Sequence, residues 1–371
     1  MREITSWLNE SSYIKPLSPG CKMCANGSKL VLLITGTCPA SCYYCPLSFK
    51  KGGKDVIYAD EWRLKNEDDI DTILKEANYI EAEGAGITGG DPLQKPERTI
   101  RYIDLLKDEF GETFHIHLYT SGLVNEKSIS DIIAAGLDEL RFHPPPTIWE
   151  TMQDSPLSKT IQRALDTSAD IALEVPAIPY QQKQLICLIN WAEQIGIQWI
   201  NLNELEFSER NTEALEQKGF MVKDDISAAA LDSQETAIAA LQHIALTDYN
   251  IGIHYCSSSF KDGIQLTNRI KRRAKNIARN IDIITEEGTI LKGIINPAGN
   301  TTLTDLATQL QQEFNQPKTS IYINKKQKRI ELHLNDLEKI AKKLTKQGHN
   351  CYIIEEYPTA DQLEVERIPL P

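Results

Sequence analysis

Short apolar runs alternate with longer amphipathic segments over most of the chain. Each short run is rich in β-branched residues and stops at a turn, which predicts strands at residues 30–34, 85–88, 115–120, 139–143, 171–178, 199–207 and 251–255. The amphipathic segments between them predict helices at 66–83, 96–107, 126–135, 157–166, 181–195 and 228–246. Strands that alternate with helices of this length indicate parallel βαβ units. The pattern therefore predicts an α/β fold, a complete or nearly complete (β/α) barrel of seven strands.

The pattern changes after residue 280. We expect strands at 281–295, 320–324, 329–334, 350–355 and 363–368, and helices at 303–314 and 336–346. That order contains βαββαβ, which is typical of a ferredoxin-like domain. The chain is thus expected to have three parts: an N-terminal extension (1–28), a barrel (29–280) and a smaller α+β ferredoxin-like domain (281–371).

Composition narrows the class of protein. The chain has 371 residues, 41% hydrophobic and 25% charged, which is ordinary for a globular protein. No apolar run approaches the ~20 residues of a membrane span, and the N-terminus lacks the pattern of a signal peptide. Eight cysteines in such a chain indicate the reducing cytoplasm, where thiols serve metals or catalysis. We therefore expect a cytoplasmic protein without a membrane partner.

A cysteine loop follows the first predicted strand. Cys38, Cys42 and Cys45 form Cys-x3-Cys-x2-Cys, and Tyr44 precedes the last thiol. Three thiolates on one loop can hold three irons of a [4Fe–4S] cluster, whereas a closed cluster needs four. The alternatives are a zinc loop and three structural cysteines. Zinc closes its structural sites with four ligands, and no His or Asp follows at hairpin spacing.

This motif resembles that of the radical S-adenosylmethionine (radical SAM) superfamily. The resemblance implies that the fourth iron binds the amino and carboxylate groups of S-adenosylmethionine (SAM). It also implies that an electron from an external donor, passed through the cluster, cleaves SAM and gives a 5′-deoxyadenosyl radical. Members typically have six βα units, so the resemblance points to a partial barrel.

A second motif follows the second predicted strand. Gly89, Gly90 and Asp91 precede a proline and resemble the family's Gly-Gly-Glu-Pro, although Asp replaces the commoner Glu. The resemblance implies that this turn and its carboxylate receive the SAM ammonium, which brings donors and no acceptor. Thr120 and Ser121 resemble the Thr-Asn that often ends the third strand of the family.

Polar residues inside the predicted strands are the next candidates. Strands of parallel barrels are usually apolar, and buried polar groups need partners. These strands nevertheless carry His115, His117, Arg141, His143, Glu174, Asn201 and Asn203. By family resemblance we assign Glu174 and Asn203, with Tyr44, to SAM binding. The alternative is that each is a satisfied core or edge residue.

Three other cysteines suggest a second metal site. Cys21 and Cys24 form Cys-x2-Cys in the extension, and Cys256 ends the seventh predicted strand. Because chemistry in a β/α barrel collects at the carboxyl ends of the strands, we expect Cys256 to meet the other two there. The site would be a second [4Fe–4S] cluster with one open iron, or a zinc or iron ion with a fourth ligand from His254 or a substrate atom. The remaining Cys187 and Cys351 are predicted to be buried packing thiols.

The charge distribution bears on partners. The net charge of −12 disfavours a uniformly basic surface, yet six basic residues and no acid lie between Arg269 and Arg279. That segment is predicted to contact phosphates of RNA or of a cofactor, or acidic protein residues, or to be a solvated helix between domains.

The predicted function follows from these motifs. We expect a radical SAM enzyme that modifies a macromolecule, RNA or protein. It is similar to the pyruvate formate-lyase activating enzyme group and to archaeal proteins related to it. The alternative is a metal-stabilised RNA- or protein-binding module without catalysis, which the intact motifs disfavour.

Overall fold

The computed structural model describes residues 2–123, 126–223 and 227–371. The chain divides into two compact units, Met1–Leu266 and Thr267–Pro371. The boundary therefore precedes the basic segment, and the first 28 residues belong to the larger unit.

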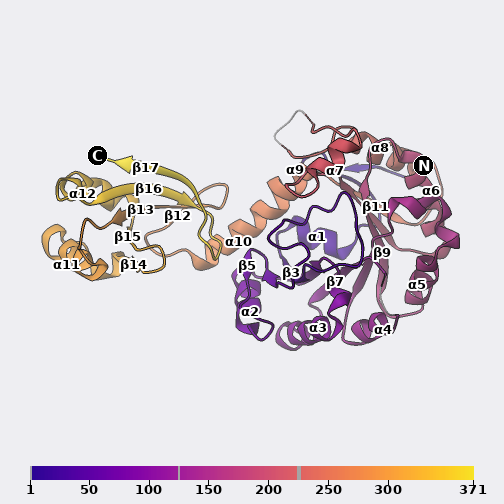
Figure 1. The fold of residues 1–371 in the computed structure, drawn as a ribbon, viewed down its shortest axis with the longest axis horizontal. Helices are drawn as coiled ribbons and strands as arrows, with labels where there is room; N and C mark the ends of the chain where they lie inside the picture. The colour runs from indigo at the N-terminus through magenta and orange to yellow at the C-terminus, as the bar shows by residue number, and fades with distance from the viewer. Residues whose placement is uncertain (1, 124–125, 224–226) are drawn as a thin grey trace. The chain divides into compact units, whose positions relative to one another are not determined.

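The larger unit is built on seven parallel strands at the positions expected from the sequence. They are β3 (Lys29–Thr35), β6 (Gly84–Gly89), β7 (His115–Thr120), β8 (Glu139–Phe142), β9 (Asp170–Ala177), β10 (Trp199–Glu204) and β11 (Gly252–Cys256). They pair in chain order, and Figure 1 shows the sheet curved around α1 (Pro19–Ala25). Among the described residues no ladder joins β3 to β11, so the barrel is partial.

Helices cover the outside of this sheet (Figure 1). They are α2 (Ile70–Tyr79), α3 (Pro96–Phe110), α4 (Glu126–Ala134), α5 (Pro156–Leu165), α6 (Gln182–Ile195) and α8 (Ser233–Ala245). The short α7 (Thr212–Gln217) and the one-turn α9 (Ser258–Phe260) follow the carboxyl ends of β10 and β11. Side chains alternate along each strand. The outward ones, such as Ile87, Leu118 and Leu173, are buried in one hydrophobic core. Many of the inward ones are polar or glycine, although Val31 and Pro176 also line the cavity that lies inside the barrel.

The N-terminal residues complete the larger unit instead of extending from it. β2 (Ser12–Ile14) pairs antiparallel with β11 and with β1 (Thr5–Ser6), and β4 (Tyr58–Ala59) and β5 (Trp62–Arg63) extend the other edge. Helix α1 packs tightly inside the barrel. A Cβ on Gly20 would lie 2.7 Å from both the Arg141 guanidinium and the His117 ring. The buried residues of this helix are small. The sequence therefore has no apolar periodicity there that would predict the helix.

The smaller unit begins with α10 (Thr267–Ile277) and continues as an antiparallel sheet with two helices. Its elements are β12 (Ile283–Ile284), β13 (Ile290–Asn296), α11 (Leu303–Phe314), β14 (Tyr322–Asn324), β15 (Arg329–Leu332), α12 (Leu334–Lys346), β16 (Asn350–Glu356) and β17 (Glu364–Leu370). The strand order is β14-β15-β13-β16-β17, and β12 pairs with β13. The helices pack on this sheet through residues such as Leu306, Leu337 and Leu344.

Buried charges cross the sheet of the smaller unit. Lys292 pairs with Glu356 at 2.6 Å, and Arg329 pairs with Glu331 at 2.8 Å and with Glu356 at 2.6 Å. Arg279 reaches Glu331 from outside the sheet at 2.6 Å. Burial alone would raise the pKa of Glu331, but Lys292 and Arg279 outweigh it and lower that pKa to about 2.

Candidate active site

The cysteine loop lines a cavity inside the barrel. The cavity measures about 820 Å³, within the range of roughly 300–1,000 Å³ that is usual for ligand sites. Cys38, Cys42 and Cys45 line it together with residues from β6 to β11. Thr120, Glu204 and Cys256, which end β7, β10 and β11, also line it. A β/α barrel carries its chemistry at these carboxyl ends of the strands.

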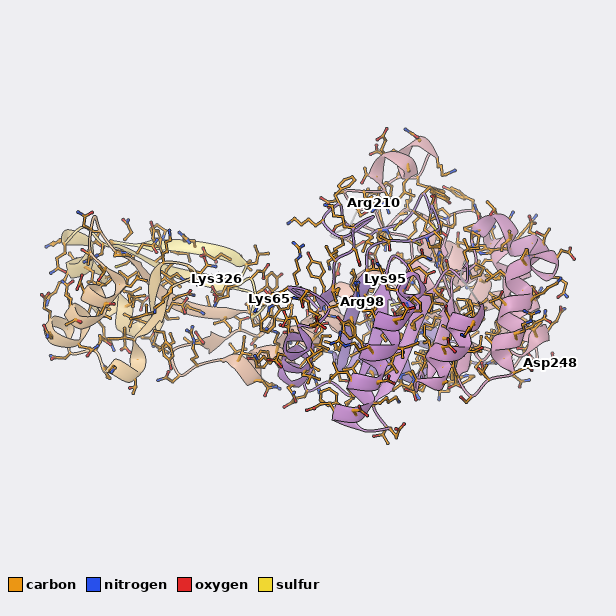
Figure 2. All side chains as sticks on the ribbon, turned by 60° about the horizontal axis from the view of Figure 1, so that its bottom comes forward. Lys65, Lys95, Arg98, Arg210, Asp248 and Lys326 are labelled. Carbon is orange, nitrogen blue, oxygen red and sulfur yellow. The ribbon has the colours of Figure 1, made fainter. Side chains whose placement is uncertain are left out.

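Backbone bonds and ion pairs hold the ends of the cysteine loop together. The Gly36 amide donates to the Lys54 carbonyl and the Gly53 amide to the Gly36 carbonyl, both at 2.8 Å. Arg98 of α3 pairs with Asp55 at 2.7 Å and donates to the Ile34 carbonyl at 2.9 Å. Lys95, which Figure 2 shows near Arg98, pairs with the same Asp55 carboxylate at 3.1 Å. The loop is therefore closed onto the end of β3.

The thiols of the loop are close enough to interact electrostatically. Burial raises the pKa of Cys38 and Cys42, and negative charge on the neighbouring thiols raises each further. A bound cation favours thiolates that would otherwise repel one another. The donor set therefore fits an iron–sulfur cluster better than three free thiolates.

Tyr44 ties the loop to the barrel wall. Its side chain is buried, and its hydroxyl lies 2.8 Å from His143 Nε2. His143 Nδ1 lies 2.7 Å from the Glu174 carbonyl oxygen. A carbonyl only accepts, so Nδ1 carries the proton and Nε2 accepts from the tyrosine hydroxyl. Burial also lowers the pKa of His143, which keeps the ring neutral.

The Gly89–Gly90 turn lies directly against the cysteine loop. A Cβ on Gly89 would lie 2.2 Å from the Thr35 carbonyl oxygen, and one on Gly90 would lie 2.2 Å from that of Thr37. Gly89 also has φ of 142°, which a side chain rarely allows. The Gly90 amide donates to the Thr35 carbonyl at 2.8 Å. The two motifs found in the sequence therefore meet, and glycine is required where they do.

Asp91 lies behind the cavity wall. Its side chain is fully buried and is not among the residues that line the cavity. The carboxylate accepts bonds from the Leu93 amide at 3.0 Å, the Thr120 hydroxyl at 3.1 Å and the Ser121 hydroxyl at 2.6 Å. Thr120 and Ser121 do line the cavity. Asp91 thus positions the end of β7 against the Gly-Gly turn.

A row of polar side chains crosses β8, β9 and β10. Glu174 accepts from Arg141 Nη1 at 2.7 Å and from Asn203 Nδ2 at 2.8 Å. Asn201 Nδ2 donates to Asn203 Oδ1 at 3.0 Å. Arg141 also pairs with Glu139 at 2.7 Å. The sequence analysis assigned no role to Arg141. Its charge inside a predicted buried strand was the feature that could have identified it as a functional residue.

The structure brings Cys21, Cys24 and Cys256 to the same cavity as the cysteine loop. The Cys21 thiol lies 3.6 Å from Arg141 Nη2. Burial raises the pKa of Cys21 to about 12. Of the remaining thiols, Cys351 is buried as expected, but Cys187 is exposed because α6 turns it away from the sheet.

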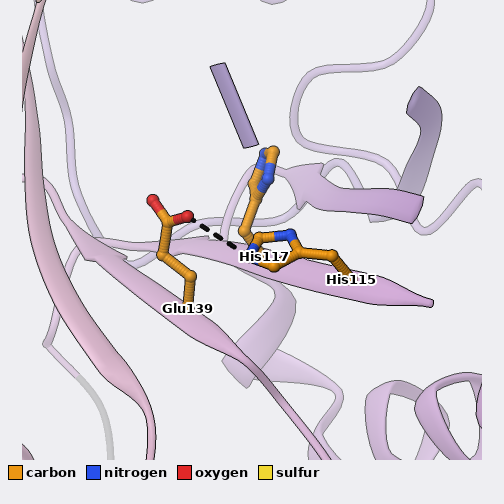
Figure 3. Close-up of side chains that lie close together, drawn as sticks. All are labelled: His115, His117 and Glu139. Carbon is orange, nitrogen blue, oxygen red and sulfur yellow. Dashed lines mark ion pairs between the residues drawn. The ribbon is translucent and has the colours of Figure 1, made fainter. Parts of the chain in front are cut away.

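The amino ends of β7 and β8 carry His115, His117 and Glu139, whose potential ligand atoms lie within 4.8 Å of one another (Figure 3). His115 Nε2 lies 3.6 Å from the Glu139 carboxylate. Lys29 Nζ lies 2.8 Å from His115 Nδ1. Burial lowers the pKa of His117 well below its ordinary value, so its imidazole is neutral.

The partial barrel with its cysteine loop and Gly-Gly turn defines a class of enzyme. The radical SAM superfamily matches residues 32–144, which contain both motifs. A domain of unknown function (DUF8061) matches residues 288–370 in the smaller unit. The chain belongs to the radical SAM superfamily, and membership implies an iron–sulfur cluster and SAM as cofactors.

The chain is similar over its whole length to a protein of Methanocaldococcus jannaschii. The two are 40% identical over 379 residues, 100% of this chain and 96% of the relative, whose name provisionally assigns it as a glycyl-radical enzyme activating enzyme. Biotin synthase of Shewanella baltica is 30% identical over 146 residues, 39% of each chain.

A search of solved structures matched methylornithine synthase (PylB), with a TM-score of 0.41 and 13% identity over 58% of this chain and 61% of that one. Streptococcus suis SuiB bound to S-adenosylmethionine gives a TM-score of 0.42 and 10% identity over 72% of this chain and 55% of that one. Within the described ranges, no helix has both the length and the apolar character of a membrane span.

Proposed function

We propose that this radical SAM enzyme holds a [4Fe–4S] cluster on Cys38, Cys42 and Cys45 and abstracts a hydrogen atom from a protein substrate. The observation that carries the proposal is one cavity lined by the three thiols, the Gly-Gly turn and a polar row. When bound, the cluster and SAM supply a 5′-deoxyadenosyl radical. The protein then has to orient SAM, admit the substrate and exclude water.

The cavity wall supplies the groups that SAM requires. The Gly-Gly turn presents Gly90 beside the cysteine loop, and the hydroxyls of Thr120 and Ser121 lie at the neighbouring strand end. These acceptors suit the ammonium, whereas Asp91 acts by holding them in place. Glu174 and Asn203, on β9 and β10, are hydrogen-bonded to each other and also line the cavity. We assign them to the ribose or carboxylate of SAM.

A protein substrate fits the charges better than RNA does. The cavity is lined by acids as well as bases, including Glu174, Glu204 and Lys261. In the basic segment, Arg273 is buried and Arg279 pairs with Asp282 and Glu331. RNA binding needs several cations that are available to phosphates. The name of the full-length relative also refers to an activating enzyme whose target is an enzyme.

We also infer that the smaller unit is a ferredoxin-like domain. Its elements β13, α11, β14, β15, α12 and β16 follow the order βαββαβ. The sheet order places β13 and β15 at the centre, flanked by β14 and β16, and β17 is an additional edge strand. Fold alone does not identify a partner, so the substrate test uses the whole chain.

The cluster assignment is tested by SAM cleavage. Anaerobically reconstituted protein, given SAM and dithionite as the electron donor, should release 5′-deoxyadenosine. Cys42→Ala should lose this activity, because the variant lacks one of three thiolate ligands. Cys187→Ala is the matched control, since Cys187 is exposed on α6. Cleavage by Cys42→Ala at the wild-type rate would refute the assignment.

The substrate class is tested by isotope transfer. Cells of the source organism are grown in deuterated medium, and their protein and RNA are purified separately. Incubation with the protein fraction should yield 5′-deoxyadenosine that carries one deuterium, because a hydrogen atom abstracted from a C–H bond is retained. Deuterium from the RNA fraction alone would overturn the proposal of a protein substrate.

A further inference from the structure

We propose that Cys21, Cys24 and Cys256 hold a second iron–sulfur cluster in the same cavity, with His254 as its fourth ligand. The cluster would lie where α1 meets β11. The proposal rests on the placement of these four residues and is independent of the substrate proposed above.

The fold brings the three thiols together from distant parts of the chain. Cys21 and Cys24 are three residues apart on α1, so their side chains lie on one face of the helix. The next residue, Ala25, packs with Cys256 and Phe260 in a small hydrophobic cluster. Cys21, Cys24 and Cys256 also line the same cavity. The fold therefore places the three thiols in one region of the barrel.

The three thiols do not have the spacing of a single-ion site. A Zn–S bond of about 2.3 Å places thiolates around one zinc ion roughly 4 Å apart. Where the structure describes the chain, His115, His117 and Glu139 form the only group of three potential ligands that all lie within 4.8 Å. Neither the three cysteines of the loop nor the set of Cys21, Cys24 and Cys256 meets that limit. A cluster distributes its ligands over several irons and so accepts the wider spacing.

His254 is the available fourth ligand. It lies two residues before Cys256 on β11, so both side chains lie on the same side of that strand. It is 3% exposed and lines the cavity. Neither ring nitrogen has a hydrogen-bond partner among the described residues. A buried polar group without a partner is costly, of order 1–3 kcal/mol, and a metal ligand bond would satisfy one of the two nitrogens.

The group at the amino ends of β7 and β8 is a weaker candidate for metal. Lys29 Nζ lies 2.8 Å from His115 Nδ1, and Arg141 Nε donates to the Glu139 carboxylate at 2.7 Å. The Ser18 hydroxyl also donates to Glu139, at 2.8 Å. A divalent ion there would be next to two buried cations, which repel it. Arg141 Nη2 also lies 3.6 Å from the Cys21 thiol, but the cysteine trio offers three potential negative charges against that one cation.

The test isolates the second cluster by removing the first. A variant with Cys38, Cys42 and Cys45 all changed to Ala keeps α1 and β11 intact. After anaerobic reconstitution and desalting, it should retain iron and acid-labile sulfide in a ratio of 1:1. Adding Cys21→Ala and Cys24→Ala should remove both, whereas adding Cys187→Ala should not. Circular dichroism checks that each variant is folded.

Two outcomes would overturn the second cluster. One is a triple variant that is folded but contains neither iron nor sulfide, and the other is a triple variant that binds zinc in place of iron. Either result leaves the first cluster untouched, because that cluster is tested separately with Cys42→Ala.

The histidine ligand is tested by spectroscopy. In the triple-variant background, the reduced cluster should show a nitrogen coupling in pulsed EPR, and His254→Ala should abolish it while iron is retained. His243→Ala is the control, because that residue lies on the outer helix α8. A coupling that persists in His254→Ala would refute the role of His254.

Discussion

Replacing Gly90 by Ala should separate cofactor binding from cluster assembly. The new Cβ would lie 2.2 Å from the Thr37 carbonyl oxygen, and side-chain carbons essentially never come within 3.0 Å of such an atom. The cysteine loop and the turn must therefore move apart by about 0.8 Å, the difference between these two distances. Overpacking of this kind costs roughly 1–3 kcal/mol of unfolding free energy.

The displacement falls where SAM is expected to bind. Misplacement by about 1 Å can reduce a rate by the order of 100-fold. The thiols remain on the loop, so we expect Gly90→Ala to bind iron like wild type but to cleave SAM at least about 10-fold more slowly. Iron is measured chemically, SAM affinity by calorimetry, and the rate by release of 5′-deoxyadenosine.

A matched glycine variant distinguishes geometry from stability. Gly196 caps α6 with φ of 85°, and a Cβ there would meet no atom within 4 Å. Gly196→Ala should lose about 1–2 kcal/mol through backbone strain alone, with SAM cleavage unchanged. If Gly90→Ala bound and cleaved SAM like wild type, the argument that the two motifs need this close contact would be refuted.

Two further predictions concern carboxylates. Asp91→Asn should lower the unfolding free energy by about 1.5–3 kcal/mol, since it weakens charge-assisted bonds to Thr120 and Ser121. A loss of SAM affinity with unchanged thermal stability would instead show that the carboxylate contacts SAM. The smaller unit should lose stability in acid, because the pKa of Glu331 is lowered to about 2 when folded. Its contribution is complete above the ordinary pKa of about 4.3 and lost as pH falls towards 2. Hydrogen exchange of β13 and β15 between pH 5 and 2 measures this, and Glu331→Gln should reduce the pH dependence. An unchanged dependence in that variant would contradict the assignment.

Local patterns were sufficient for the strands and for membership of the radical SAM superfamily. Each inner strand is a short apolar run, and its direction follows from the alternation with helices. The positions of the seven strands are those expected from periodicity. The cysteine spacing and the Gly-Gly turn are also local features, and both lie within the segment that matches the superfamily. These properties depend on neighbours in the chain, which a sequence displays directly.

The contacts within the cavity depend on the tertiary structure. From the sequence Asp91 was expected to contact SAM. In the structure its carboxylate accepts hydrogen bonds from the Leu93 amide and from Thr120, which lies 29 positions later in the chain. Arg141 joins Ser18, Glu139 and Glu174, which lie on three different elements or loops. Which residues on separate strands become hydrogen-bond partners depends on the register and the curvature of the sheet. Neither property produces a periodic pattern in the sequence.

The N-terminal segment shows the same limit. The sequence showed that Cys21 and Cys24 form Cys-x2-Cys in an N-terminal extension, and that Cys256 ends a strand. Only the fold decided that this segment becomes a helix inside the barrel, with small residues packed on β7 and β8. Its burial comes from contacts with strands about a hundred residues or more away in the chain. A periodic pattern of apolar residues shows which face of an element is buried. A helix that is buried through glycine, alanine and cysteine has almost no such pattern. Its location is determined by the space inside the barrel.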